Sequence, residues 1–205
     1  MKPNNMKDKF QKQPLFIGQD TAFEAAIIIP LVEIENQWHI VFELRSQNMS
    51  KQPGDVSFPG GKIDITDLSP EFAAIRETHE ELGVALDEIT ILTDLSPFIF
   101  SPNFAIYPFV AEIPYQENYA VSEAEVEKII TIPLDWLLEH EPYMHVMSFL
   151  PKPSDDFPFE KIAKGRDYDW RKQATEEWFY EYEGITIWGV TARILKYFIE
   201  QLKNN

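Results

Sequence analysis

Residues 60–84 read GGKIDITDLSPEFAAIRETHEELGV. A helix is predicted to begin at Pro70, because proline suits the first turn and the Ser69 side chain can cap the free backbone N–H groups. Gly83 can end this helix, since glycine readily adopts the left-handed conformation at a helix C-terminus. Both ends of one helix are therefore marked in the sequence, shortly after a double glycine.

Three carboxylates share one face of this predicted helix. At about 100° per residue, Glu77, Glu80 and Glu81 fall within roughly 100° of arc. Such a cluster repels itself unless a cation neutralises it, and its hard oxygen ligands suit Mg²⁺ or Mn²⁺. The opposite face is apolar and is predicted to be buried, through Phe72, Ile75 and Leu82.

Most glutamate runs on helices are solvated surfaces, and this alternative would be preferred for an isolated Glu-x-x-Glu-Glu motif. Here Arg76 adjoins the cluster, and residues 58–61, Phe-Pro-Gly-Gly, follow a strand-like run. This context favours a site for a divalent metal and a phosphate over a solvated face.

Residues 61–84 resemble the signature box of the Nudix hydrolases, Gly-x5-Glu-x7-Arg-Glu-U-x-Glu-Glu-x-Gly-U, in which U is a bulky aliphatic residue. The Arg-Glu-x-x-Glu-Glu core is intact. The interval before Arg76 is one residue longer than in this pattern, and Thr78 replaces the first aliphatic residue. The early glutamate is absent, and the nearest carboxylate is Asp67 or Asp64.

The longer interval is similar to that of one subgroup, the coenzyme A pyrophosphatase branch. Residues 44–46, Leu-Arg-Ser, followed by residues 54–61, GDVSFPGG, also resemble a second motif of that branch. Further similarities extend the resemblance over most of residues 20–200.

The chain departs from the branch pattern at two places. The branch usually carries Leu-Thr where this chain has Glu43-Leu44, and a second arginine where it has Ser50-Lys51. Lys51 could replace the bidentate phosphate contact of an arginine only as a point charge. These departures bear on the choice of substrate more than on pyrophosphate chemistry itself.

The resemblance implies an α/β fold, a Nudix-type α/β/α sandwich with a mixed sheet. It also implies metal-dependent hydrolysis of the pyrophosphate of coenzyme A or acyl-coenzyme A, which gives adenosine 3′,5′-bisphosphate and 4′-phosphopantetheine. An ADP-ribose or dinucleotide pyrophosphatase is the alternative within this chemistry. A catalytically silent nucleotide-binding sensor is the alternative of another class, and the intact glutamates argue against it.

Site roles follow from the motif and from the need to neutralise a pyrophosphate. Glu77 and Glu81 are the first expected metal ligands, Glu80 is a third ligand or a general base, and the Gly61 carbonyl could complete the metal shell. Arg76 is expected to orient the glutamates through a salt bridge rather than contact the substrate. The predicted substrate contacts are Arg45, Ser46, Lys51 and Gly60.

Other polar residues receive no catalytic role. His79 lies on the apolar face of the predicted helix and is expected to be packed, and Phe58 is expected in the core. The remaining histidines, His39, His140 and His145, show no ligand spacing. Four further carboxylates near predicted element ends stay unassigned: Glu112, Glu117, Glu123 and Glu125.

Composition limits the remaining classes of function. The chain has 205 residues, 44% of them hydrophobic, and a formal net charge of −16, which argues against nucleic acid as a partner. It has no cysteine, which excludes thiol catalysis. It shows neither a signal peptide nor an apolar run of transmembrane length, so a small-molecule substrate and a cytoplasmic location are expected, with no membrane partner. A homodimer is left open.

The sequence predicts a flexible N-terminal arm at residues 1–20 and one domain at residues 21–205. An insertion is predicted near residues 149–175, which are rich in proline, charged residues and aromatic residues. Predicted strands are 25–32, 38–44, 89–92, 98–100 and 105–113, with a turn at 36–37 and a hairpin formed by 178–182 and 185–188. Predicted helical segments, besides the glutamate-rich one, are 122–128, 134–139 and 191–202.

Overall fold

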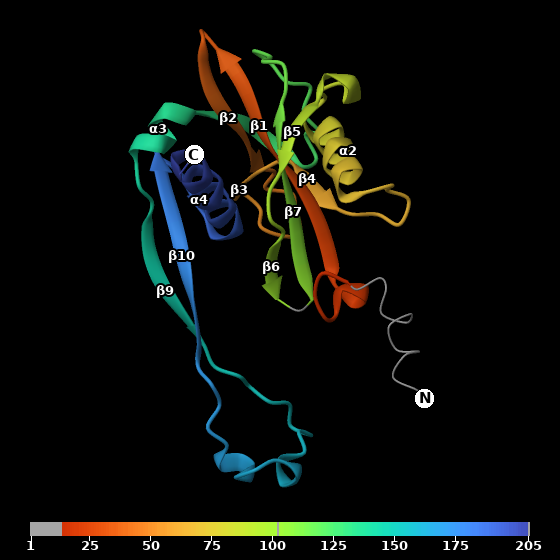
Figure 1. Cartoon of the computed structure of the whole chain (residues 1–205), viewed down its shortest axis with the longest axis vertical. Coiled ribbons are helices and arrows are strands. Elements are labelled where there is room, and N and C mark those ends of the chain that lie inside the picture. The colour runs from red at the N-terminus through yellow and green to blue at the C-terminus, as the bar shows by residue number, and fades with distance from the viewer. Residues whose placement is uncertain (1–13, 102, 205) are drawn as a thin grey trace.

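The computed structural model describes residues 14–101 and 103–204, and its centre is an eight-stranded sheet of order β3-β2-β1-β7-β5 (Figure 1). β4 pairs with β1, β6 with β7, and β8 with β2. β1 and β7 run parallel, whereas the other pairs are antiparallel, so the predicted mixed sheet is confirmed. The strands are β1 Phe23–Ile34, β2 Gln37–Arg45, β3 Val56–Ser57, β4 Gly60–Lys62, β5 Thr90–Asp94, β6 Phe98–Ser101, β7 Phe104–Glu112 and β8 Val126–Pro133.

Helices cover both faces of this sheet. α2 (Pro70–Leu82) packs on one face, and α3 (Leu134–Glu139) and α4 (Gly189–Asn204) lie on the other. Successive side chains of β1 point to opposite faces of the sheet and so contribute to both cores. Ala26 and Ile28 belong to the core under α2, and Ala25 and Ile29 belong to the core under α4. The predicted α/β/α sandwich is therefore confirmed.

The tight turn between β1 and β2 lies one residue earlier than predicted. Glu35 and Asn36 have φ values of 51° and 63°, the pair of positive angles that a two-residue hairpin turn requires. Gln37 already belongs to β2, opposite Ile34.

A second, smaller sheet has the order β11-β10-β9. It contains the predicted hairpin of β10 (Gln173–Tyr182) and β11 (Ile185–Trp188), and a strand that was not predicted, β9 (Tyr143–Phe149). All seven residues of β9 are exposed, so no alternation of polar and apolar residues marked it.

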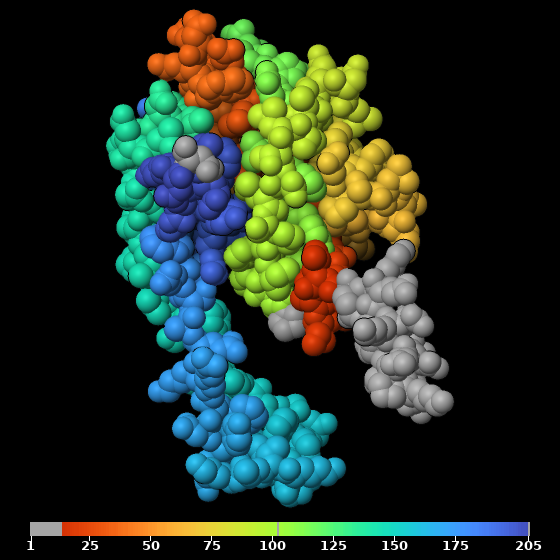
Figure 2. Space-filling model, viewed as in Figure 1, coloured from red at the N-terminus to blue at the C-terminus, as the bar shows by residue number. Residues whose placement is uncertain are grey.

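Residues 150–172 connect β9 to β10 and project from the body of the molecule (Figure 2). Two short 3₁₀ turns, Phe159–Lys161 and Gly165–Asp167, shape this segment. Its rings contact one another, and the residues involved are Phe157, Phe159, Tyr168 and Trp170. The limits assigned to the domain and its insertion stay predictions, and residues 1–13 of the predicted arm lie outside the described residues.

The helical prediction for residues 122–128 is wrong. Residues 122–125 form turns, and Val126 begins β8, which pairs along β2 from His39 to Arg45. Val126, Ile130 and Ile132 are buried, so pairing and burial outweigh the local helix signal. The helix at 134–139 is confirmed with the predicted bounds, and α4 includes the predicted 191–202.

Candidate active site

α2 begins and ends as the sequence predicts. The Ser69 hydroxyl oxygen accepts a hydrogen bond from the Phe72 backbone N–H at 3.1 Å, and Pro70 occupies the first helical position. At the other end Gly83 is left-handed, with φ 71°, and its N–H donates to the His79 carbonyl. These caps fix where the glutamates lie relative to the sheet.

The buried face of α2 agrees only in part with the predicted one. Leu82 is buried and Ile75 packs against the core, as predicted. Phe72, however, is 42% exposed, and Glu81 is only 3% exposed. Ala73 and Ala74 are small enough to let the helix approach the sheet closely, which turns their side of the helix inward and carries Glu81 with it. The buried residues are Ala73, Ala74, Thr78, Glu81 and Leu82.

His79 is also placed differently. It is exposed rather than packed in the core, and its Nδ1 lies 2.7 Å from the Val84 carbonyl oxygen, just beyond the end of α2. The imidazole therefore belongs to the end of the helix and takes no part in the carboxylate cluster.

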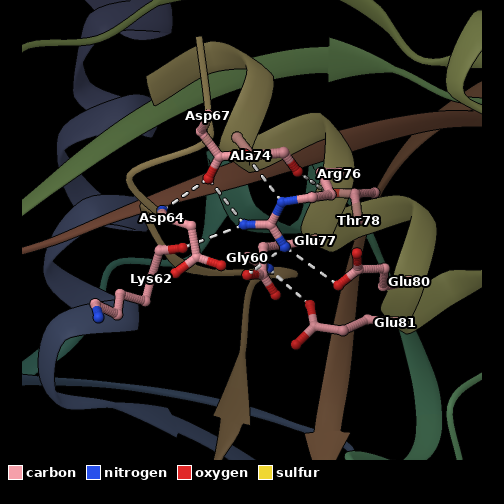
Figure 3. Close-up of polar contacts among 10 residues, drawn as sticks. All are labelled: Gly60, Lys62, Asp64, Asp67, Ala74, Arg76, Glu77, Thr78, Glu80 and Glu81. Carbon is pink, nitrogen blue, oxygen red and sulfur yellow. Dashed lines mark hydrogen bonds and ion pairs between the residues drawn. The ribbon is translucent and has the colours of Figure 1, made fainter. Parts of the chain in front are cut away.

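Arg76 organises the polar face of α2 (Figure 3). Its Nε and Nη2 donate to the two carboxylate oxygens of Asp67, each at 3.0 Å. Its Nη1 donates to Glu77 at 2.8 Å and to Glu80 at 3.2 Å. These bonds lower the pKa of the Asp67 carboxyl and raise that of the Arg76 guanidinium. Arg76 thus holds two glutamates in fixed orientations.

The double glycine brings backbone against the carboxylates. The Gly60 N–H donates to Glu81 Oε2 at 2.8 Å. A Cβ on Gly61 would lie 2.5 Å from the Glu77 carboxyl carbon, so a side chain there would displace the Glu77 carboxylate. β4 therefore places its backbone within reach of both Glu77 and Glu81.

Glu43, which sequence reasoning treated only as a departure from a pattern, is buried beside this cluster. Its side chain is 1% exposed, and the Ser57 hydroxyl donates to its Oε1 at 3.0 Å. Burial raises the pKa of Glu43. Burial also raises the pKa of Glu81, and the negative charge of Glu43 adds to that shift.

The side chain of Glu77 is partly buried. Burial raises its pKa, and the Arg76 hydrogen bond opposes that shift. Glu125, one of the unassigned carboxylates, repels Glu43, Glu77 and Glu81 alike. It reaches them because residues 122–125 form turns and the Glu125 carbonyl accepts from the Ser46 N–H at 2.8 Å.

The donor set suits a hard divalent cation. Among the described residues no three acidic or histidine side chains form a ready-made cage, and Arg76 occupies part of the space around Glu77 and Glu80. One oxygen of Glu43 is nevertheless buried without a hydrogen-bond donor, next to carboxylates that repel it. A cation would neutralise this repulsion, so the residues present fit Mg²⁺ or Mn²⁺.

A cavity of about 430 Å³ is linked to the carboxylates through Ser57 and Gly60, which line it and donate to Glu43 and Glu81. Arg45, Ser57 and Gly60 line it on the side of the cluster, and aromatic side chains form much of the remaining wall. Among these, Trp188 donates from its indole N–H to Asp55 at 3.2 Å, which ties β11 to the loop before β3. Phe58 lines the cavity and is also in the core, stacked on Phe42.

Only two of the four residues predicted to contact the substrate line the cavity. Arg45 and Gly60 line the cavity, whereas Ser46 and Lys51 are not among its lining residues. Ser46 is 4% exposed, and Lys51 is exposed on the loop before β3. Their substrate contacts stay predictions.

Comparison with known proteins identifies the family. The NUDIX domain family matches residues 23–149, which is more than half of the chain. An uncharacterized Nudix hydrolase, NudL of Enterobacter sp. (strain 638), is 32% identical over 173 residues, covering 84% of this chain and 79% of the relative. The chain belongs to the Nudix hydrolases. Proteins of this family generally use divalent metal ions and act on small nucleotide substrates.

Two further Nudix proteins show similarity. The peroxisomal coenzyme A diphosphatase NUDT7 of Mus musculus is 28% identical over 118 residues, and the match spans 58% of this chain and half of that protein. A crystal structure of a Nudix hydrolase from M. smegmatis, RenU, has a TM-score of 0.47 and 16% identity, covering 57% of this chain and 74% of that one.

Among the described residues, none of the helices has both the length and the apolar character needed to cross a bilayer.

The raised pKa values of the buried carboxyls make the stability of the metal-free enzyme depend on pH. Their folded-state pKa values, about 7 for Glu43 and about 10 for Glu81, exceed the ordinary 4.5. The folded state therefore keeps protons that the unfolded chain has released, and the free energy of unfolding falls as pH rises above 4.5. With a chelator present, we expect a lower melting temperature at pH 8 than at pH 5.

The net charge of the chain also weakens stability at higher pH, so a variant is needed as a control. Glu81→Gln should show a smaller fall in melting temperature over the same pH range. An equal fall in the variant and the wild type would contradict a raised pKa at Glu81.

Proposed function

We propose that this Nudix hydrolase cleaves the pyrophosphate of coenzyme A or acyl-coenzyme A, giving adenosine 3′,5′-bisphosphate and 4′-phosphopantetheine. The observation that carries the proposal is the position of Gly60. It lines a cavity that has Arg45 on its wall, and its N–H donates to Glu81 in the carboxylate cluster that Arg76 holds.

The carboxylates are the proposed metal-binding part. Glu77 and Glu81, with Glu80 and the Gly61 carbonyl, would hold Mg²⁺ or Mn²⁺. When bound, the ion would neutralise the charge of the pyrophosphate and activate a water molecule. Glu80 is 52% exposed, so its carboxylate can serve as a ligand or as the base that takes the proton from this water.

Hydrogen bonds keep these groups in place before the substrate arrives. Arg76 holds Glu77 and Glu80 through Nη1, and Asp67 holds Arg76 through two parallel bonds. The Gly60 N–H fixes the orientation of Glu81. Preorganisation of this kind lowers the cost of forming the transition state.

The cavity provides the proposed substrate-binding part. Arg45 can bind a phosphate as a fork of N–H donors, and the apolar wall, which includes Phe104 and Trp188, can accept the uncharged portions of a large nucleotide derivative. The name of the relative NUDT7, a coenzyme A diphosphatase, supports coenzyme A as the substrate.

The alternative substrates are ADP-ribose and dinucleotides. Ser50 and Lys51 stand where the coenzyme A branch has its second arginine, and Lys51 does not line the cavity. Fewer phosphate contacts would suit a substrate that lacks the 3′-phosphate of coenzyme A. A silent sensor is a third alternative, which the preoriented glutamates disfavour.

The test is a comparison of coenzyme A, acyl-coenzyme A, ADP-ribose and dinucleotides at equal concentrations with Mg²⁺ or Mn²⁺. We expect the highest kcat/KM for a coenzyme A derivative. Arg45→Ala should lower that kcat/KM about 10² fold, since it removes a charged contact worth about 1.5–3 kcal/mol.

Arg45→Lys is the matched control for Arg45→Ala, because it keeps the charge but loses the fork, and it should recover part of the activity. Preference for ADP-ribose or a dinucleotide would replace the coenzyme A proposal while keeping the metal site. Binding without turnover of any substrate would favour the sensor.

A further inference from the structure

Glu43 is a buried carboxyl beside the site, and one of its oxygens has no hydrogen-bond donor in the described part of the chain. It lies in β2 opposite Ser57 of β3, and its side chain is 1% exposed. Burying a carboxylate is costly unless hydrogen bonds or a cation compensate the lost hydration. The contacts of its two oxygens therefore indicate what the residue does.

Only one oxygen of Glu43 has a protein donor among the described residues. Oε1 accepts from the Ser57 hydroxyl at 3.0 Å. Arg45 Nη1 lies 3.9 Å from the same oxygen, at the limit of an ion pair, while the buried Arg45 Nε has no partner. Oε2 is buried and has no donor. The guanidinium therefore leaves the second oxygen uncompensated.

The Glu43 and Glu81 carboxyls are close enough for their charges to interact, since the negative charge of Glu43 helps to raise the pKa of Glu81. Two carboxylates have no donor between them, so either a shared proton or a cation must offset this repulsion. Glu77 and Glu125 add further negative charge around Glu81. A shared proton neutralises one charge of this group, whereas a divalent ion neutralises two and accepts several oxygens at once.

We propose that Glu43 is an additional oxygen ligand of the divalent-metal centre that contains Glu81. The inference rests on the proposed metal site and extends it to a residue outside the glutamate-rich helix. β2 then contributes a ligand from one side, while α2 and the Gly60–Lys62 strand contribute from the other.

Calorimetric titration of the full chain with Mn²⁺, without substrate, tests this role. Glu43→Gln keeps the size of the side chain and removes the charge. We expect Mn²⁺ binding at least tenfold weaker than in the wild type, with a smaller Mn²⁺-induced rise in melting temperature. Glu33→Gln, at an exposed position of β1, is the matched control and should bind Mn²⁺ as the wild type does.

Measuring Glu81→Gln alongside Glu43→Gln distinguishes an error in the role of Glu43 from an error in the proposed metal site. Unchanged Mn²⁺ binding in Glu43→Gln, with weak binding in Glu81→Gln, would keep the metal site and overturn the role of Glu43 in favour of a shared proton. Unchanged binding in both variants would overturn the proposed metal site itself. Should Glu43→Gln not fold, Glu43→Asp decides, because a shortened carboxylate weakens coordination while retaining the charge. Wild-type affinity in Glu43→Asp would then contradict the proposal.

Discussion

Replacing Glu81 by glutamine is expected to lower kcat for pyrophosphate hydrolysis about 10³ fold. Losing a charged metal ligand removes several kilocalories per mole of electrostatic stabilisation from the transition state, and each 1.36 kcal/mol corresponds to about tenfold in rate. Glu81 is 3% exposed, so water cannot readily take the place of its charge. The amide oxygen of glutamine can still accept from the Gly60 N–H, which keeps the local structure.

The measurement is kcat at saturating Mg²⁺ and substrate, with circular dichroism to check folding. The metal-free variant should be at least as stable as the wild type at pH 8, because the raised pKa makes Glu81 take up a proton on folding at that pH and glutamine does not. Glu33→Gln provides the control for an exposed carboxylate and should retain full activity. A loss smaller than tenfold in Glu81→Gln would show that Glu81 is not a required ligand.

Features set by neighbouring residues could be predicted from the sequence. Ser69, Pro70 and Gly83 mark the ends of α2 because capping depends on groups within one helical turn. The strands flanking the site could likewise be recognised, since β1 is a nearly continuous apolar run and residues 40–42 of β2 are apolar, although β2 buries residues 40–43 in succession and does not alternate. The pairing of Arg76 with Glu80 follows from their i,i+4 spacing on one helix.

Features set by tertiary packing could not be predicted. The inward rotation of Glu81 depends on how closely Ala73 and Ala74 let α2 approach the sheet, which the helical period alone does not reveal. Glu43 joins the site through the register of β2 with β3, far from the signature motif in sequence. An acidic residue directly after the apolar residues 40–42 of β2 was the available signal, and it was interpreted only as a departure from a family pattern.

Substituting alanine for Gly60 is expected to lower the free energy of unfolding by about 4 kcal/mol. Gly60 has φ 143°, and a Cβ there would lie 2.3 Å from the Ala26 carbonyl oxygen and 2.6 Å from the Ile27 Cα. Both contacts are with backbone of β1, the strand at the centre of the sheet, so no flexible side chain can move aside. Urea denaturation measures the change directly.

Gly184→Ala is the matched control, because Gly184 also has a positive φ, of 79°, but nothing lies within 4 Å of the added Cβ. Its cost should be that of the left-handed conformation alone, about 1 kcal/mol. The difference between the two variants isolates the close approach of β4 to β1, which also aims the Gly60 N–H at Glu81. Gly60→Ala should therefore lose activity even where it remains folded, whereas Gly184→Ala should not. Equal stability losses in both variants would contradict the β4 backbone position on which the arrangement of the carboxylates depends.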